Sequence, residues 1–170
     1  MEAPITPAAE RTATLAFART FLVQAAAIPV SGIVLGNDPQ LLGIIGQLRH
    51  IAGGCLGAEE MAAHLCRLVD AEITPLANVA HAEHALLRAE AIRLQHTNPH
   101  VARVVRDEQA FFLHREEFLR ALAGLCLHLS CALRNDNRAL AIRRTGEQYA
   151  WACFTTTVAL IIDHNQRGVA

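Results

Sequence analysis

The residue best placed to do chemistry is a histidine on a helix face that carries few side chains. Residues 39 to 54 are expected to form a helix, and at 100° per residue their apolar side chains fall on one side and His50 on the other. Glycines dominate the His50 side, with Gln47 nearby: Gly43, Gly46, Gly53 and Gly54. Because glycine inside a helix costs roughly 1 kcal/mol relative to alanine, this face needs an explanation.

Two explanations are open, and they predict different environments for the imidazole. In the first, the missing side chains let another protein reach a ring nitrogen of His50, as phosphoryl transfer between proteins requires. In the second, Gly43 and Gly46 allow another helix to pack closely, and His50 is hydrogen-bonded inside that contact. The ring is therefore expected to face solvent under the first explanation and to be buried under the second.

The residues that follow His50 resemble those of histidine-containing phosphotransfer domains. In that family an exposed histidine on a bundle helix has a glycine four residues later, then a Leu-Gly-Ala turn and an amphipathic helix. The residues here stand in the same order: His50, Gly54, Leu56-Gly57-Ala58, Met61-Ala62, Cys66 and Leu68. The resemblance covers residues 8 to 97 at most. It implies that His50 Nε2 accepts and passes on a phosphoryl group, with a response-regulator receiver domain as the partner.

The positive charge beside such a phosphoryl group would come from Arg49. The family's lysine three residues after the histidine is Gly53 here, and all fifteen basic residues of the chain are arginine. The expected phosphate neighbours are therefore Arg49, Gly53 and Gly54. Arg49 points roughly 100° away from His50 around the helix.

A second chemistry is available at polar residues on apolar helix faces. The helix expected from Leu76 to Gln95 has an apolar stripe with two glutamates near its centre, and the next helix has a histidine on its stripe and a glutamate at the margin. Buried carboxylates are costly unless they are paired or bind metal. A transition metal in the core of a helical-bundle enzyme would use carboxylate and imidazole ligands, and the candidates are Glu83, Glu90, His114 and Glu117.

An ion-pair network accounts for the same carboxylates without a metal. Arg143, Arg144 and Glu147 interrupt the apolar face of the last helix, where they could neutralise Glu83 and Glu90. If neither phosphate nor metal binds, the chain is expected to be a non-catalytic helical adaptor that binds one protein partner.

The remaining motifs indicate no further catalytic site. Several histidines gather around a helix end and its turn, where solvated imidazoles are common and adventitious metal binding is the alternative: His81, His84, His96 and His100. Neither serine lies in a nucleophile elbow, and the GxxxxGK and GxGxxG phosphate-binding patterns are absent.

Start and stop signals predict about six helices. Thr6-Pro7, Asp38-Pro39 and Asn98-Pro99 each place a capping residue before a proline in the first turn. Gly53-Gly54 and Pro75 are expected to end helices, and Asn135-Asp136-Asn137 to form a turn. The sequence shows no strand alternation and no internal repeat. The expected fold is thus an all-α antiparallel bundle.

Length and composition favour one α-helical domain spanning residues 1–170. Residues 8–97 would be the four-helix, phosphotransfer-like part, and residues 98–170 an additional helical pair that could make a homodimer. The net charge of −1 provides no field to attract nucleic acid or a membrane surface. The uncharged stretch from 20 to 36 is expected to be core, since it is only just long enough to span a membrane. Five cysteines without a CxxC pair, and an N-terminus without a basic region, predict a cytoplasmic protein with free thiols.

Overall fold

The described part of the chain is helical throughout and contains no strand. The computed structural model describes residues 6–28, 38–134 and 140–168. Its elements are α1 (Pro7–Ala27), α3 (Pro39–Gly53), α4 (Ala58–Leu68), the π-helical turn η1 (Val69–Ile73), α5 (Thr74–Leu94), α6 (Pro99–Arg134) and α7 (Leu140–Gly168). The all-α prediction is confirmed. None of the described helices is long and apolar enough to cross a membrane.

Three helices begin where the sequence predicts, and each has a side-chain cap. The Thr6 hydroxyl accepts a hydrogen bond from the Ala9 N–H at 3.3 Å, and the Asp38 carboxylate accepts one from the Gln40 N–H at 2.9 Å. Asn98 does the same for Val101 at 3.3 Å. Each bond satisfies one of the backbone donors that a helix start leaves free. The turn expected at Asn135-Asp136-Asn137 lies outside the described residues.

The expected helix end at Pro75 is wrong, because the chain continues without a break from α4 through η1 into α5. In η1 the Thr74 N–H donates to the carbonyl of Val69, five residues earlier, which is the wider π-helical pattern. Pro75 lies in the first turn of α5, where its missing N–H costs little. Because α4, η1 and α5 form one continuous helix, the described residues contain five packed helices where about six were expected.

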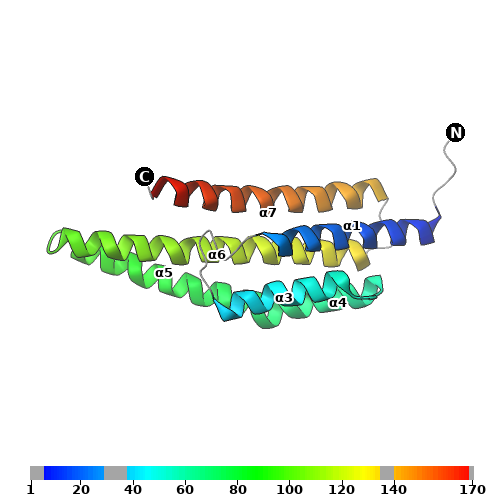
Figure 1. The fold of residues 1–170 in the computed structure, drawn as a ribbon, viewed down its shortest axis with the longest axis horizontal. Coiled ribbons are helices and arrows are strands. Elements are labelled where there is room, and N and C mark those ends of the chain that lie inside the picture. The colour runs from blue at the N-terminus through cyan, green and yellow to red at the C-terminus, as the bar shows by residue number, and fades with distance from the viewer. Residues whose placement is uncertain (1–5, 29–37, 135–139, 169–170) are drawn as a thin grey trace.

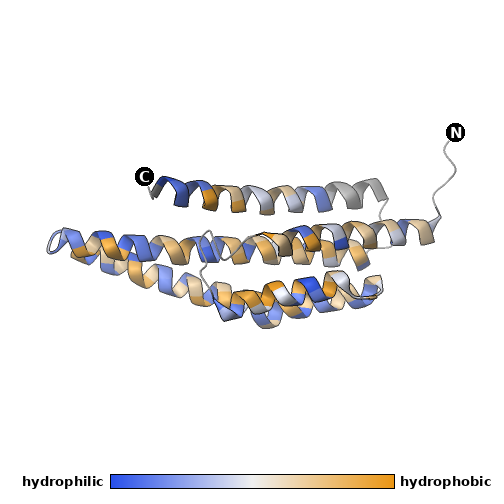
Figure 2. Ribbon diagram, in the orientation of Figure 1, coloured by the Kyte–Doolittle hydropathy of each residue, from blue (hydrophilic) through white to orange (hydrophobic). Residues whose placement is uncertain are grey.

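The core lies at one end of the molecule, in a region we call the bundle: α1, α3, α4, η1, α6 from residue 118 onward, and α7. Figure 1 shows these helices side by side, and in Figure 2 apolar segments are prominent in α3. Fully buried side chains from all these elements include Leu22, Leu48, Leu65, Ile73, Leu122, Leu129 and Phe154. Residues 98–170 thus supply part of the same core as α1, α3 and α4.

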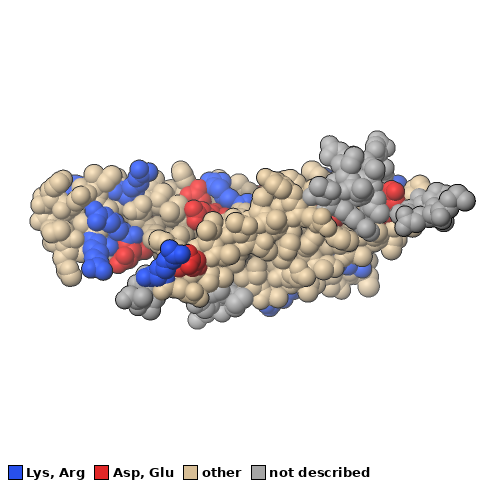
Figure 3. Space-filling model, turned by 90° about the horizontal axis from the view of Figure 1, so that it is seen from above, with Lys and Arg blue, Asp and Glu red and all other residues tan. Residues whose placement is uncertain are grey.

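Beyond the bundle, α5 and α6 run on together as a two-helix arm, which comprises residues 78–117 and has the C-terminal end of α7 beside its base at His114 (Figure 1). Its buried residues are three alanines and one histidine: Ala80, Ala91, Ala102 and His114. None of the three alanines belongs to the bundle core cluster. On the face seen in Figure 3, the charged side chains gather toward the arm end of the molecule.

Candidate functional site

The imidazole of His50 is exposed. Helix α3 buries an apolar face against the bundle through Leu41, Ile44, Ile45, Leu48 and Ile51. The opposite face carries the exposed residues Gly43, Gly46, Gln47, His50 and Gly53, which we call the glycine face. The division of α3 into an apolar side and a His50 side is confirmed.

No other helix of the described chain covers the glycine face. A Cβ atom added at Gly43, Gly46 or Gly53 would meet nothing within 4 Å. Within the described residues, no second helix packs around His50, which is exposed. The glycines cost helix stability, and a side chain in their place would clash with no described residue.

Gly54 differs from the other three glycines because it caps the helix. Its N–H donates to the His50 carbonyl at 3.0 Å, and its backbone is extended, with φ −73° and ψ 160°. A Cβ added there would lie 3.2 Å from that same carbonyl oxygen. Steric contact with the end of α3, rather than a left-handed backbone, explains glycine at this position.

Two arginines fix the end of α3 against α1. Arg19 of α1 donates from Nη2 to the carbonyls of Gly54 at 3.2 Å and Leu56 at 2.9 Å. Arg49 donates from Nη2 to the Ala26 carbonyl at 3.0 Å. The side chain expected to neutralise a phosphoryl group is therefore engaged with α1. It would contact a phosphate on His50 only after exchanging that bond.

A groove lies next to the glycine face, between α3 and the η1–α5 junction. It has a volume of about 420 Å³, and its lining residues are Gln40, Gly43, Ile44, Ala71, Glu72, Pro75, Leu76 and Val79. Gln47 donates a hydrogen bond to Glu72 across the same junction. Gly43 lies two turns before His50, about 10 Å along the helix axis. A protein that contacts His50 could therefore reach the groove as well.

The four residues considered as metal ligands do not meet at one place. His114 and Glu117 are together on α6, where His114 Nδ1 and Glu117 Oε2 are 3.2 Å apart. On α5, Glu90 pairs with Arg93, whose Nε donates at 2.8 Å, and Glu83 is exposed. Within the described chain, none of these four belongs to a group of three ligand atoms within 4.8 Å.

The expected apolar stripe on α5 explains this outcome, because only part of it is buried: Leu76 and Ala80 are buried, but the side that carries Glu83 is exposed. Val79 is 58 % exposed and Leu86 is 66 % exposed. Helix α5 instead packs on α6 through small residues, with Ala80 and Ala91 buried. The hydrogen bond from Arg93 lowers the pKa of the Glu90 carboxyl, so Glu90 has an ionic partner on its own helix. The side chains of Arg143 and Arg144 lie outside the described residues.

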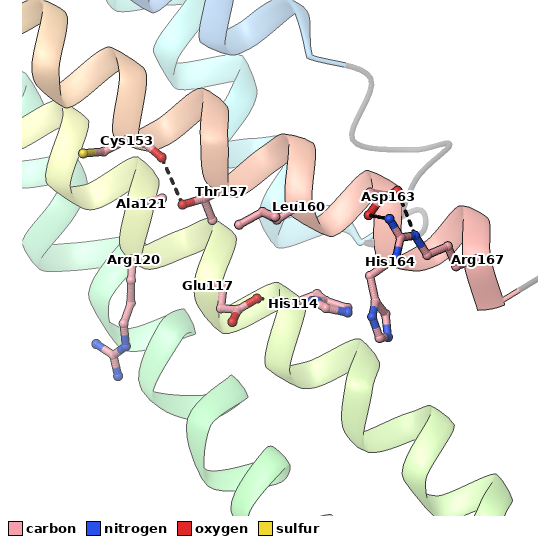
Figure 4. A pocket seen from close by; sticks show the side chains of 10 residues that line it. All are labelled: His114, Glu117, Arg120, Ala121, Cys153, Thr157, Leu160, Asp163, His164 and Arg167. Atoms are coloured by element: carbon pink, nitrogen blue, oxygen red, sulfur yellow. Dashed lines mark hydrogen bonds and ion pairs between the residues drawn. The ribbon is translucent and has the colours of Figure 1, made fainter.

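His114 and Glu117 line a pocket of about 670 Å³ between α6 and α7 (Figure 4). The His114 ring lies 4.7 Å, centroid to centroid, from that of His164, and Asp163 pairs with Arg167 beside them. His114 Nε2 is buried and has no hydrogen-bond partner. Because it is enclosed, His114 cannot present a nitrogen to another protein as His50 can.

Sequence reasoning missed a polar cluster in the arm. His81 and His84 were expected near a helix end with His96 and His100, but they lie within α5 and contact Glu116 and Gln109 of α6. The spacing of three residues could have indicated that the two histidines share a helix face. Their partners on α6 depend on how the two helices align.

Comparison of the chain with protein-family models, with curated proteins and with solved structures finds no match. The resemblance to phosphotransfer domains accordingly depends on the residues around His50 alone.

Proposed function

We propose that the chain is a phosphotransfer-like signalling module that accepts a phosphoryl group on His50 and passes it to another protein. The main support is an exposed imidazole on a helix face that glycines keep free of side chains. Interior glycines cost a helix roughly 1 kcal/mol each, and no described part of the chain packs on these. Their benefit must then lie outside the fold, and access to His50 is such a benefit.

The chemistry needs only a neutral imidazole and a correctly oriented donor. The Nε2 lone pair attacks the phosphorus of an aspartyl phosphate on a partner receiver domain. A P–N bond forms as the P–O bond to the aspartate breaks, and the aspartate leaves as a free carboxylate while Nδ1 keeps its proton. Positioning and charge stabilisation dominate phosphoryl transfer, so the receiver's aspartate and Mg²⁺ would do most of the catalysis.

The position of His50 favours onward transfer over storage of the phosphoryl group. His50 lies in the last turn of α3, where the partial negative charge of the helix end disfavours an added anion by about 0.3–1 kcal/mol. Arg49 is held by the Ala26 carbonyl and offers little compensation. A phosphoryl group on this ring would therefore be lost readily to the next acceptor.

The partner would dock on the glycine face and the adjoining groove. The groove mixes apolar and polar lining, with Leu76 and Val79 beside Gln40 and Glu72. Rigid docking here would hold a receiver's aspartate over His50 without a change in the bundle. The proposed partner is therefore a protein domain rather than a small molecule enclosed by the chain.

Labelling with a histidine phosphodonor tests the proposal. The full chain is incubated with phosphoramidate, or with a receiver domain carrying radioactive phosphate, and acid-labile, base-stable phosphate is measured. We expect about one phosphate per chain in the wild type and none in His50→Gln. The site is assigned by mass spectrometry under alkaline conditions.

A matched control is His128→Gln. His128 is also an exposed helical histidine, but its Nδ1 donates to the Gly124 carbonyl at 2.9 Å, and it lies outside the glycine face. This variant should be labelled like the wild type. Equal labelling of His50→Gln and wild type, or no labelling of either by both donors, would overturn the proposal.

A further inference from the structure

Two histidines on one face of α5 meet a single carboxylate from α6. His81 Nδ1 lies 3.0 Å from Glu116 Oε1 and 3.1 Å from Oε2. His84 is one turn further along α5. One ligand atom from each of His81, His84 and Glu116 can be chosen so that all three lie within 4.8 Å of one another. Glu116 is nearly enclosed, with 12 % of its side chain exposed, whereas His81 opens to solvent at 61 %.

His84 offers a nitrogen that the protein itself does not use. Its Nε2 contacts the Gln109 side-chain amide at 3.3 Å, while its Nδ1 is buried and has no hydrogen-bond partner. If the Gln109 amide turns its oxygen toward Nε2, that nitrogen carries the proton and Nδ1 keeps a free lone pair. Histidines that bind metals are commonly oriented in this way through their second nitrogen.

We infer that His81, His84 and Glu116 bind one divalent transition-metal ion of the Zn²⁺ class and thereby join α5 to α6. Two imidazoles and one carboxylate are typical ligands of zinc, which leaves a fourth position for water on the exposed His81 side. In a tetrahedral site with bonds of about 2.0–2.2 Å, ligand atoms lie roughly 3.4 Å apart. The three residues therefore need only a small side-chain movement. On binding, the ion takes the place of the proton between His81 Nδ1 and Glu116, and the neutral His81 ring keeps one proton on Nε2.

The Glu116 carboxylate is held in place by two neighbours, because His81 and Arg120 both contact it. Arg120 Nε donates to Oε1 at 2.7 Å, so Oε2 can bind the ion while that hydrogen bond remains.

The location explains what the ion would do for the fold. The fully buried apolar residues of the arm are alanines, and larger side chains such as Leu87 and Phe111 are only partly buried, so α5 and α6 gain less from apolar burial there than the helices of the bundle do. A metal that takes ligands from both helices would hold the arm together, as structural metals do in other domains with small cores.

Metal titration of the full chain tests the inference. Chelator-treated protein is titrated with Zn²⁺ by calorimetry, and with Co²⁺ while its visible spectrum is recorded. We expect one ion per chain, the absorption bands of tetrahedral Co²⁺, and slower hydrogen exchange of amides in the arm when Zn²⁺ is bound. His84→Gln and Glu116→Gln should each raise Kd by about 100-fold or more.

Two further variants separate this site from incidental binding. His96→Gln removes an exposed histidine of the same arm and should leave Kd unchanged. Gln109→Leu removes the group that orients His84 and should raise Kd by about 10-fold. No zinc binding by the wild type, or binding that survives both His84→Gln and Glu116→Gln in proteins with wild-type circular dichroism, overturns the inference.

Discussion

The bundle and the arm place histidines in opposite settings. In the bundle, His50 stands on an exposed face whose neighbouring residues are glycines, and its helix is fixed from behind by a full apolar core. In the arm, His81 and His84 are drawn into contacts with Glu116 and Gln109 across a helix pair whose buried apolar residues are alanines. A strong core allows a polar side chain to be left free for a partner. Where the core is weak, polar side chains take part in holding the helices together.

The largest expected difference is between the alkylation rates of two cysteines, because these rates report how well the bundle core excludes solvent. Burial raises the pKa of the Cys126 thiol from 9.0 to about 12, with a smaller contribution from Cys66. At pH 8 its thiolate fraction falls about a thousandfold, and so should its alkylation rate. Cys131, exposed on the same helix, is the internal control. Mass spectrometry after timed iodoacetamide treatment measures both; similar rates would mean that the bundle core is open.

Truncating a leucine to alanine should lower the free energy of unfolding by several kcal/mol more in the bundle than in the arm. Leu122 is fully buried in the bundle, and Leu122→Ala should reduce the free energy of unfolding by about 2–5 kcal/mol. Leu86 is 66 % exposed in the arm, and Leu86→Ala should change the free energy of unfolding by less than about 0.5 kcal/mol. Urea denaturation followed by circular dichroism measures both. Equal losses would contradict the assignment of one core to the bundle.

Removing the arginine that fixes the end of α3 should have an intermediate effect. Arg19→Met loses the hydrogen bonds to the Gly54 and Leu56 carbonyls and should destabilise the protein by about 1.5–3 kcal/mol. It should also slow labelling of His50 without abolishing it, because the ring remains but its helix end is less well held. Arg88→Met, at an exposed position of the arm, is the control and should be neutral. Unchanged stability in Arg19→Met would show that the turn needs no such support.

In the arm, removing a positive charge should strengthen metal binding. Arg120 competes for the Glu116 carboxylate and repels a cation beside it. Arg120→Gln should therefore lower the Kd for Zn²⁺ on the order of tenfold, a modest value because half of the Arg120 side chain is exposed to screening solvent. Calorimetric titration of the variant beside wild type measures it. Weaker binding would mean that Arg120 orients the carboxylate more than it opposes the ion.

The smallest expected change in stability has the opposite sign. Gly46→Ala places a methyl group in open space on α3 and should stabilise the helix by up to about 1 kcal/mol. The same methyl group lies one turn from His50 and should slow phosphotransfer from a receiver more than from phosphoramidate. Gly54→Ala should instead destabilise, because its Cβ meets the His50 carbonyl oxygen at 3.2 Å. Thermal denaturation measures the two changes in stability, and labelling rates from a receiver and from phosphoramidate measure the effect on phosphotransfer.

The features that the sequence predicts correctly are local ones. The helix starts at Thr6, Asp38 and Asn98 follow from a capping side chain and the next proline, which act within one turn. The apolar face of α3 follows from its own periodicity. The helix end at Pro75 was predicted wrongly, because a π-helical turn accommodates the ring at a site that local rules treat as a stop.

The features that could not be predicted depend on helix pairing. The apolar stripe expected on α5 joins Val79 and Leu86, which are exposed, to Leu76 and Ala80, which are buried, and only contact with α6 decides which part is buried. Centring that stripe on Glu83 and Glu90 put them in the core, where they are not. The contact between His84 and Gln109, 25 positions apart, likewise requires knowledge of how α5 and α6 align.

The π-helical turn η1 determines in which direction the side chains of α5 point relative to those of α4. Because η1 accommodates one residue more than an α-helical turn would, every side chain of α5 is rotated by about 100° relative to α4. Deleting one residue from η1 would restore a regular helix and turn His81 and His84 away from Glu116, and it would also shift Val69 and Ile73, which belong to the bundle core. The one extra residue in this turn thus determines which face of α5 meets α6, and with it whether the arm can form a polar cross-link.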